Sequence, residues 1–257
     1  MYMKIMKFFE IKKSDFEPIK SFKMKDNLCP DVWDGFKIKE DILEQLLTIG
    51  KDFFENIDID AKLIDMTLVG SLANYNWSSK YSDFDLHIII NFEELGGDIK
   101  FIIKFCDYAK KIWNREHDIT INGFPVEIGL QDEQNLIESM ESKKMGGVFS
   151  LTNNKWIKKP EKVNFEMDSD LIIDKSKTIM MMIDDVEVEL NKGGDYYKMD
   201  NELSKAWKKI KDSRKSGLEL EGGEFSVGNL VFKLLRRNGY IEKVIKLRKK
   251  LYESKFK

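Results

Sequence analysis

A length of 257 residues, 42% of them hydrophobic, fits one large domain or two modest ones and supplies enough apolar side chains for a buried core. This composition excludes a chain that is disordered throughout, and no apolar run approaches the roughly 20 residues that a membrane-spanning helix needs. The formal net charge of −2 is unevenly distributed, because residues 196–257 carry 17 Lys and Arg against 8 Asp and Glu, a net +9, which leaves −11 for the rest. An acidic front and a basic tail suit a metal site and a phosphate-rich partner, although helix surfaces are often rich in Lys and Glu without either.

The N-terminal region is not typical of a targeting segment. Its apolar residues are interrupted by Lys and Glu, and it lacks a small-residue cleavage site, so we interpret it as part of the mature protein. Cys29 and Cys106 lie far apart without the spacing of metal ligands, which indicates reduced thiols and a cytoplasmic location. Pro18 and Pro30 punctuate residues 1–35, where we expect an irregular arm with room for one short strand.

Helical and extended periods alternate along the first part of the chain. The predicted elements, in chain order, are a helix over 39–56, a strand over 63–69, a largely buried strand over 83–92 and a helix over 98–115. The dipeptide Asn122-Gly123, between two alternating runs, then predicts a hairpin because both residues tolerate positive φ. The polar pair Asn153-Asn154 predicts a second hairpin.

After Pro160 the hydrophobic period becomes helical throughout. The predicted helices cover 168–191, 195–215 and 226–254. The residues that separate or interrupt them are Gly193-Gly194, Gly222-Gly223 and Asn238-Gly239. Mixed elements followed by helices predict an α+β protein with its ligand site between two parts. The expected domains are an N-terminal arm (1–35), an α/β domain with a mixed sheet flanked by helices (36–160) and an all-helical C-terminal domain (161–257).

The stretch LVGSLANYNWSSKYSDFDLHIII carries the most informative pattern. A strand ends at Gly70-Ser71. Eleven residues separate Ser71 from Asp83, and Asp83 and Asp85 stand two apart on the next strand, so both carboxylates project from one face. Like charges held that close repel, and a hard cation with oxygen ligands, such as Mg²⁺ or Mn²⁺, makes the arrangement favourable. The alternative is two exposed aspartates on a surface strand. Against it, apolar residues follow on both faces, and the backbone N–H groups of the Gly-Ser turn can cradle phosphate oxygens.

A third carboxylate is expected from a neighbouring strand. In FPVEIGL, Glu127 stands between Val126 and Ile128, shortly after the Asn-Gly turn. A buried Glu at this position needs a partner, which a metal ion would supply. An outward-facing Glu on a half-exposed strand is the alternative that strand alternation allows. Because two aspartates are already present, we expect Glu127 to join them.

This pattern resembles the signature of the nucleotidyltransferase superfamily that includes DNA polymerase beta. The signature consists of Gly-Ser, a gap of similar length and then Asp-apolar-Asp-apolar. Poly(A) and CCA-adding polymerases, aminoglycoside nucleotidyltransferases and the oligonucleotide cyclases belong to the same superfamily. The resemblance covers about residues 64–130 and implies the nucleotidyltransferase core. The whole chain, including FSVGNLVFKLLRRNGYIEK near its end, is also similar to uncharacterised predicted nucleotidyltransferases of tailed phages.

The resemblance implies that a nucleoside monophosphate moves from an NTP such as ATP to a hydroxyl acceptor, with release of pyrophosphate. Asp83 and Asp85 would bridge two Mg²⁺ or Mn²⁺ ions, and Glu127 would help to hold the ion that activates the acceptor hydroxyl. The Gly70 backbone and Ser71 would hold the β and γ phosphates. The acceptor could be RNA such as tRNA, a protein, a small molecule or a second nucleotide, and no membrane partner is expected. The pattern leaves the base preference and the oligomeric state open.

Further candidates lie beside this pattern. His87 continues the alternation from Asp85, either as a donor that supports the site or, more commonly, as a satisfied core residue. The segment before Asp83 borders the nucleotide in the superfamily. Its candidates are Asn74, Tyr75, Asn76, Trp77 and Lys80. An aromatic ring in this segment could stack on a base or pack in the core.

Cations for the triphosphate are expected from the helical half. The candidates are Lys205, Lys208, Lys209, Lys233, Arg236 and Arg237. Helical spacing places Lys205 and Lys209 on one face, and Lys233 and Arg237 on another. Charged runs are usually solvated, so the cluster is a better candidate than any single member. We assign nucleotide binding to Lys205, Lys209 and Lys233.

Two other functions fit part of the pattern. Asp83-Phe84-Asp85 also satisfies the Asp-x-Asp motif of metal-dependent glycosyltransferases, but that interpretation uses neither the Gly-Ser turn nor Glu127. A non-catalytic module that binds a nucleotide or a nucleic acid is the second alternative. The presence of all three carboxylates favours an enzyme over such a module.

Overall fold

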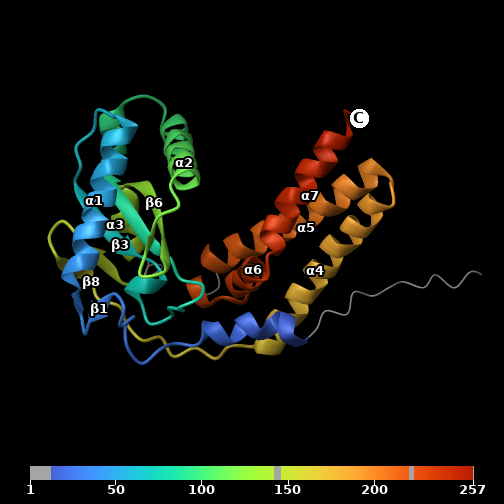
Figure 1. Cartoon of the computed structure of the whole chain (residues 1–257), viewed down its shortest axis with the longest axis horizontal. Coiled ribbons are helices and arrows are strands. Elements are labelled where there is room, and N and C mark those ends of the chain that lie inside the picture. Colours follow the sequence, from blue (N-terminus) through green and yellow to red (C-terminus); the bar gives the residue numbers. More distant parts are fainter. Residues whose placement is uncertain (1–12, 142–145, 220–222, 257) are drawn as a thin grey trace, which may run out of the picture. The chain divides into compact units, whose positions relative to one another are not determined.

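The computed structural model describes residues 13–141, 146–219 and 223–256 (Figure 1). These residues fall into two compact units, each with its own hydrophobic core. The α/β unit spans Lys23–Asn164, and the helical unit combines the described residues up to Phe22 with those from Phe165 onward. The expected α+β class is confirmed for the described residues: a mixed region of strands and helices comes first, and the described residues after β8 form helices without strands.

A mixed sheet with strand order β5-β6-β4-β3-β7-β8 forms the centre of the α/β unit. Its strands are β3 (Asp65–Val69), β4 (Phe84–Ile90), β5 (Thr120–Ile121), β6 (Phe124–Asp132), β7 (Val148–Ser150) and β8 (Lys155–Lys158). Strands β4 and β6 run parallel, whereas β3 is antiparallel to both of its neighbours, β4 and β7. Parallel neighbours need a crossover connection, and a helix between β4 and β6 provides it. The first residues of β4 and β6 therefore meet at the same end of the sheet.

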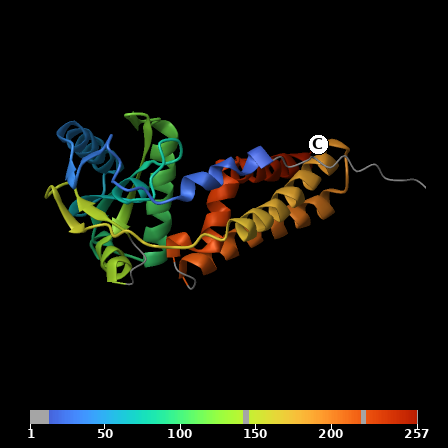
Figure 2. The same ribbon diagram turned by 90° about the horizontal axis from the view of Figure 1, so that it is seen from below.

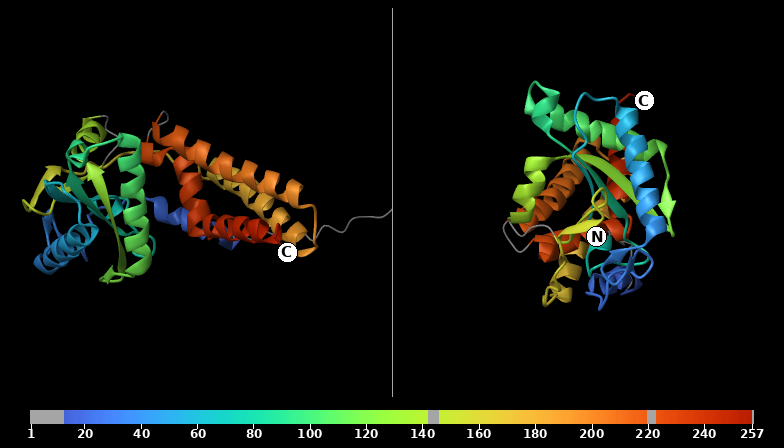
Figure 3. Two further views of the ribbon diagram at one scale, coloured as in Figure 1. Left: turned by 90° about the horizontal axis from the view of Figure 1, so that it is seen from above. Right: turned by 90° about the vertical axis from the view of Figure 1, so that its left-hand side faces the viewer.

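Helices cover both faces of this sheet. They are α1 (Glu40–Ile57), α2 (Ile99–Glu116) and α3 (Glu133–Glu141), and short 3-10 turns occur at η2 (Ser71–Ala73) and η3 (Phe92–Leu95). A two-stranded ribbon of β1 (Trp33–Asp34) and β2 (Lys37–Ile38) packs beside them. Figure 3 (right) shows α1 and α3 on opposite sides of the sheet.

Strand alternation gives β4 two different environments. Leu86 and Ile88 are buried in the main core with residues of α1 and α2. Ile89 points to the other face, where it clusters with Leu136 of α3. Asp85 is on the same face as Ile89, four positions nearer the start of the strand, and is only half-buried. The face that carries α3 is therefore the one that presents polar side chains at the beginning of β4.

The two predicted hairpins are confirmed. Asn122 and Gly123 link β5 to β6 with φ values of +49° and +82°, which are the positive angles that a tight primed turn requires. Asn154, with φ +47°, lies in the turn between β7 and β8, which pair antiparallel. Local turn chemistry therefore fixes the two edges of the sheet.

The helical unit consists of helices and 3-10 turns. Its elements are η1 (Lys13–Phe22), α4 (Ser169–Asn191), α5 (Tyr196–Glu219), η4 (Gly223–Phe225), α6 (Val227–Arg237) and α7 (Tyr240–Ser254). Helices α4 and α5 lie side by side (Figure 2). The Asp168 side chain caps α4 by accepting a bond from Leu171 N at 2.9 Å, and Ser226 caps α6 in the same way. Gly239, with φ +75°, ends α6 and starts α7, so the predicted interruption at Asn238-Gly239 is confirmed.

Two segments differ from the expectation. The described part of the N-terminal arm contains a 10-residue 3-10 helix, η1, where irregular chain was expected, whereas the short strand β1 agrees with the expectation. Phe16 and Phe22 of η1 are buried in the core of the helical unit, which explains the regular structure. Helix α3 was not predicted, because its sequence EQNLIESME has only one residue, Leu136, that becomes buried.

Candidate metal centre

Gly70 ends β3 in a backbone conformation that needs a glycine. Its φ of +75° and ψ of −159° belong to a region that is essentially closed to other residues. A Cβ atom at this position would also collide with the Asp85 carboxylate, its nearest neighbour being Oδ2. The turn therefore brings backbone directly against one of the predicted ligands.

Asp83, Asp85 and Glu127 come together at the start of β4 and β6. Asp85 and Glu127 are register partners across the parallel pair, and Asp83 precedes β4 by one residue. One carboxylate oxygen from each of the three residues lies within 4.8 Å of those of the other two, and all three residues are half-buried. The structure thus places the three predicted carboxylates in one cluster.

The chemistry of this cluster fits a hard divalent cation. Carboxylate oxygens are the ligands that Mg²⁺ and Mn²⁺ prefer, and no sulfur or imidazole nitrogen is part of the group. The strands fix the carboxylates on one face, so little side-chain reorganisation is needed to surround an ion. Half-burial leaves the site accessible to a ligand from one side.

A cation that the sequence did not single out lies next to the third carboxylate. Lys110 of α2 places its Nζ 3.2 Å from Glu127 Oε1, and both side chains are partly exposed. The stem of Lys110 passes over Gly129, where an added Cβ would come within 3.0 Å of Lys110 Cδ. The absence of a side chain at Gly129 therefore makes room for the lysine to reach across β6.

Asn114, one helical turn further along α2, ties the helix to the same strand. Its side chain donates to Ile128 O at 2.9 Å and accepts from Ile128 N at 3.1 Å. These two bonds satisfy backbone groups on the side of β6 that faces away from β4. The clamp fixes α2 beside Glu127 and so also sets the position from which Lys110 extends.

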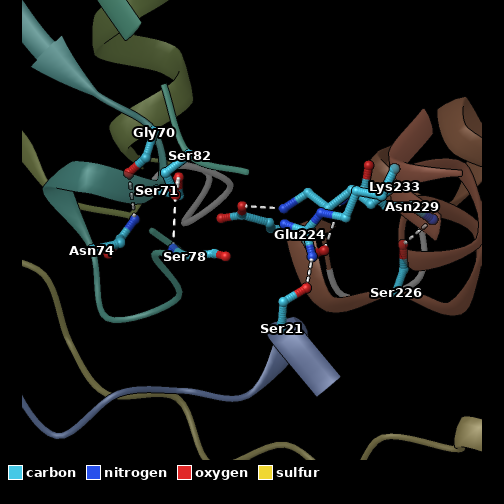
Figure 4. A network of polar contacts seen from close by, with 11 residues as sticks. Ser21, Gly70, Ser71, Asn74, Ser78, Ser82, Glu224, Ser226, Asn229 and Lys233 are labelled. Carbon is cyan, nitrogen blue, oxygen red and sulfur yellow. Dashed lines mark hydrogen bonds and ion pairs between the residues drawn. The ribbon is translucent and has the colours of Figure 1, made fainter. Parts of the chain in front are cut away.

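Hydroxyl groups organise the loop between the Gly-Ser turn and Asp83 (Figure 4). Ser71 Oγ lies 2.7 Å from Ser82 Oγ, and Ser82 Oγ also accepts a bond from Ser78 N at 2.9 Å. The loop is therefore closed by a direct contact between its first and last parts. Ser82 was not predicted to contribute, although its place next to Asp83 is visible in the sequence.

Asn74, one of the candidates in this loop, has a structural role. Its side chain donates to Gly70 O at 3.4 Å and accepts from Gly147 N at 3.2 Å, and it is buried. Added Cβ atoms at Gly146 would collide with this amide. Asn74 thus supports the Gly70 turn from behind.

The aromatic residues of the loop also pack against protein. Trp77 donates from Nε1 to Asn27 O at 2.9 Å, and Tyr75 is buried at the edge of the main core. Lys80 is exposed and lies over the Tyr81 ring. These contacts favour the packing interpretation for Tyr75 and Trp77.

His87 is on the face of the carboxylates and is hydrogen-bonded within the sheet. Its Nδ1 lies 2.5 Å from Gln131 Oε1 on β6. Burial lowers the pKa of His87, the bond to Gln131 opposes this shift, and the nearby Lys110 ammonium lowers the pKa further. Neutral imidazole is therefore favoured, and its hydrogen bond makes His87 a satisfied sheet residue next to the site.

The predicted phosphate-binding lysines all belong to the helical unit. Lys205 and Lys209 are exposed one helical turn apart on α5. Lys233 of α6 forms an ion pair of 2.6 Å with Glu224, and both side chains are mostly buried (Figure 4). That pair gives Lys233 a role within its own unit, and the nucleotide-binding role of the three lysines remains a prediction.

Comparison of the chain with protein-family models, with curated proteins and with solved structures found no match. In the described part of the chain, no helix combines the length and the apolarity that a membrane span requires. The interpretation of the site rests on the geometry of its own residues.

Proposed function

We propose that this protein is a metal-dependent nucleotidyltransferase that moves a nucleoside monophosphate from an NTP to a hydroxyl acceptor and releases pyrophosphate. The observation that carries the proposal is the cluster of Asp83, Asp85 and Glu127, whose ligand atoms lie within 4.8 Å of one another beside the Gly70 turn. An Asp-x-Asp glycosyltransferase needs only the two aspartates, so the register of Glu127 and the glycine against Asp85 would have no purpose there.

The proposed roles follow from position. Asp83 and Asp85 lie two residues apart at the start of β4 and would together hold two divalent ions. Glu127, on the neighbouring strand, would hold one of these ions as well. Bound Mg²⁺ or Mn²⁺ would supply charge neutralisation for the triphosphate and a lowered pKa for the acceptor hydroxyl. The Gly70 backbone allows close approach of the triphosphate, and Ser71, oriented by Ser82, offers a hydroxyl to it.

A label-transfer experiment tests this reaction against its rivals. The full chain is incubated with Mg²⁺ or Mn²⁺ and each NTP labelled at the α-phosphate or at the γ-phosphate, with bulk tRNA or without an added acceptor. A nucleotidyltransferase attaches the α label to an acceptor and releases the γ label as pyrophosphate. Release of the γ label as inorganic phosphate would instead indicate a hydrolase.

Two further arms complete the design. Glu127→Gln removes a charge from the proposed site while it keeps the side-chain shape, and it is expected to lower label transfer by about a hundredfold. UDP-sugars replace the NTPs in the second arm. Transfer of sugar in place of nucleotide would refute the proposal in favour of a glycosyltransferase, and NTP binding without any transfer would favour a binding module.

A further inference from the structure

Lys110 forms an ion pair of 3.2 Å with Glu127, one of the three clustered carboxylates. The ammonium thus occupies a position beside Glu127 that a cation would favour. Two cations cannot share one face of a carboxylate without repulsion, because unit charges about 4 Å apart interact strongly near a protein surface.

The rest of α2 holds Lys110 at this place. Asn114 anchors the helix to Ile128, the residue after Glu127, and Gly129 leaves a path for the lysine stem. A lysine on a solvated helix face would have neither constraint. The neighbouring Lys111 illustrates the contrast, since it is exposed and lies over the Tyr108 ring of its own helix.

We infer that Lys110 is a positioning residue that competes with a divalent ion for Glu127. The ammonium holds the Glu127 carboxylate, so an ion bound mainly by Asp83 and Asp85 is little affected, whereas an ion that also needs Glu127 must displace the lysine. The inference rests on the metal site of the proposed function. It adds that the two ions bind with unequal affinity and that Lys110 sets the difference.

Direct ion binding tests the inference without any need for turnover. Mn²⁺ binding to the full chain is measured by calorimetry and by the loss of the free-ion signal in electron paramagnetic resonance. Wild type is expected to show one tighter and one weaker ion. In Lys110→Met the weaker ion should bind about two- to fivefold more tightly, the range expected for losing one partly exposed charge pair, while the affinity of the tighter ion should change less than that.

Three variants separate this effect from a change in net charge or in folding. Lys111→Met removes the same charge from the next residue and should leave both affinities unchanged. Lys110→Arg keeps a cation at this position, so the weaker ion should bind with about the same affinity as in wild type. Gly129→Ala keeps every charge but crowds the lysine stem. It should therefore increase the affinity for the weaker ion, as Lys110→Met does, but to a smaller extent.

The outcomes distinguish the role of Lys110 from the existence of the metal site. Identical isotherms for Lys110→Met and wild type, with both proteins folded by circular dichroism, would overturn the role of Lys110 and leave the metal site standing. An equal shift in Lys111→Met would also overturn it, because net charge would then explain the effect. Failure of the folded wild type to bind Mn²⁺ would overturn the metal site and the inference together.

Discussion

At Gly70 the conformation of one residue and the position of a ligand are coupled. The backbone there has a positive φ, and the Asp85 carboxylate fills the space in which a side chain would start. Gly96 lies in the same backbone region, with φ +63° and ψ 159°, but nothing lies within 4 Å of its added Cβ. A side chain at either glycine would strain the backbone, but only a side chain at Gly70 would also contact the carboxylate cluster.

We predict that Gly70→Ala and Gly96→Ala each lower the free energy of unfolding by about 1–3 kcal/mol, the cost of forcing a side chain into this backbone region. Only Gly70→Ala should also weaken Mn²⁺ binding, because its methyl group displaces Asp85. Urea denaturation and Mn²⁺ titration measure the two effects. Equal Mn²⁺ affinities for the two variants would contradict the account.

Cys106 gives a pH-dependent prediction. Burial, and next the negative charge of Asp107, raise the pKa of this thiol from 9.0 to about 11. The unfolded chain therefore loses this proton at a lower pH than the folded chain. The corresponding stability is fully present below pH 9 and is lost as the pH rises toward 11.

The expected size of this loss is about 2–3 kcal/mol for a shift of this magnitude. Urea denaturation of wild type and of Cys106→Ala at pH 8 and at pH 10.5 measures it, since other titrating groups contribute to both proteins alike. The fall in stability between the two pH values should be smaller in Cys106→Ala. The same fall in both proteins would show that Cys106 is not the cause.

The proximity of the three carboxylates in the candidate site could be predicted from the sequence. Alternation along a strand was enough to place Asp83 and Asp85 together. Lys110 could not be found in this way, because a lysine in a basic helix is normally solvated. Its contact with Glu127 depends on how α2 packs against β6, which is a tertiary property.

Helix α2 acts as a support for the edge of the sheet. Strand β5 pairs with β6 only at Phe124 and Pro125, so the rest of that edge depends on other partners. Asn114 provides them for Ile128, next to Glu127. The proposed metal site would therefore depend on Asn114, which supports the strand that carries Glu127.

Asn114→Ala should lower the free energy of unfolding by about 1–3 kcal/mol, because it leaves the N–H and C=O groups of Ile128 without these bonds. Hydrogen exchange of the Ile128 amide should accelerate more than that of the amides in β3. Arg115→Ala, a change at the next and exposed position, serves as the control. Unchanged exchange at Ile128 would show that the clamp is not a support.

Elements with strong local signals were predicted well. The two hairpins follow from Asn and Gly residues that accept positive φ, and the long helices follow from their apolar periods. Helix α3 buries little apolar surface, so its sequence carries no strong period. Parallel pairing of β4 with β6 was not determined by local sequence either, since α2 and a long connection separate the two strands.

The described residues form two cores, and that of the helical unit is discontinuous in sequence. The core of the helical unit includes Phe16 and Phe22 from η1, whereas the α/β unit lies between them and α4 along the chain. Arg237 also packs over the Phe22 ring at 4.5 Å. The basic tail seen in the sequence is thus part of a unit that needs residues from the N-terminal region.

We predict that residues 23–164 alone fold cooperatively and bind Mn²⁺ with wild-type affinity, since their core and carboxylate cluster are complete without the helical unit. Residues 165–257 alone should be less stable than the full chain, because they lack the η1 aromatics. Thermal unfolding and Mn²⁺ titration of the fragments measure both effects. A fragment 23–164 without a cooperative transition would contradict the independence of the α/β unit.

Pyrophosphate release from NTPs by the full chain with Mg²⁺ or Mn²⁺, compared between wild type, Asp85→Asn and Asp107→Asn, tests whether the carboxylate cluster supports nucleotidyl transfer. Asp107 is an exposed carboxylate on α2, so its variant controls for the loss of one negative charge. We predict release by wild type and by Asp107→Asn, and a fall to background in Asp85→Asn. Equal release from all three proteins would contradict it, because the carboxylate cluster would then play no part in the reaction.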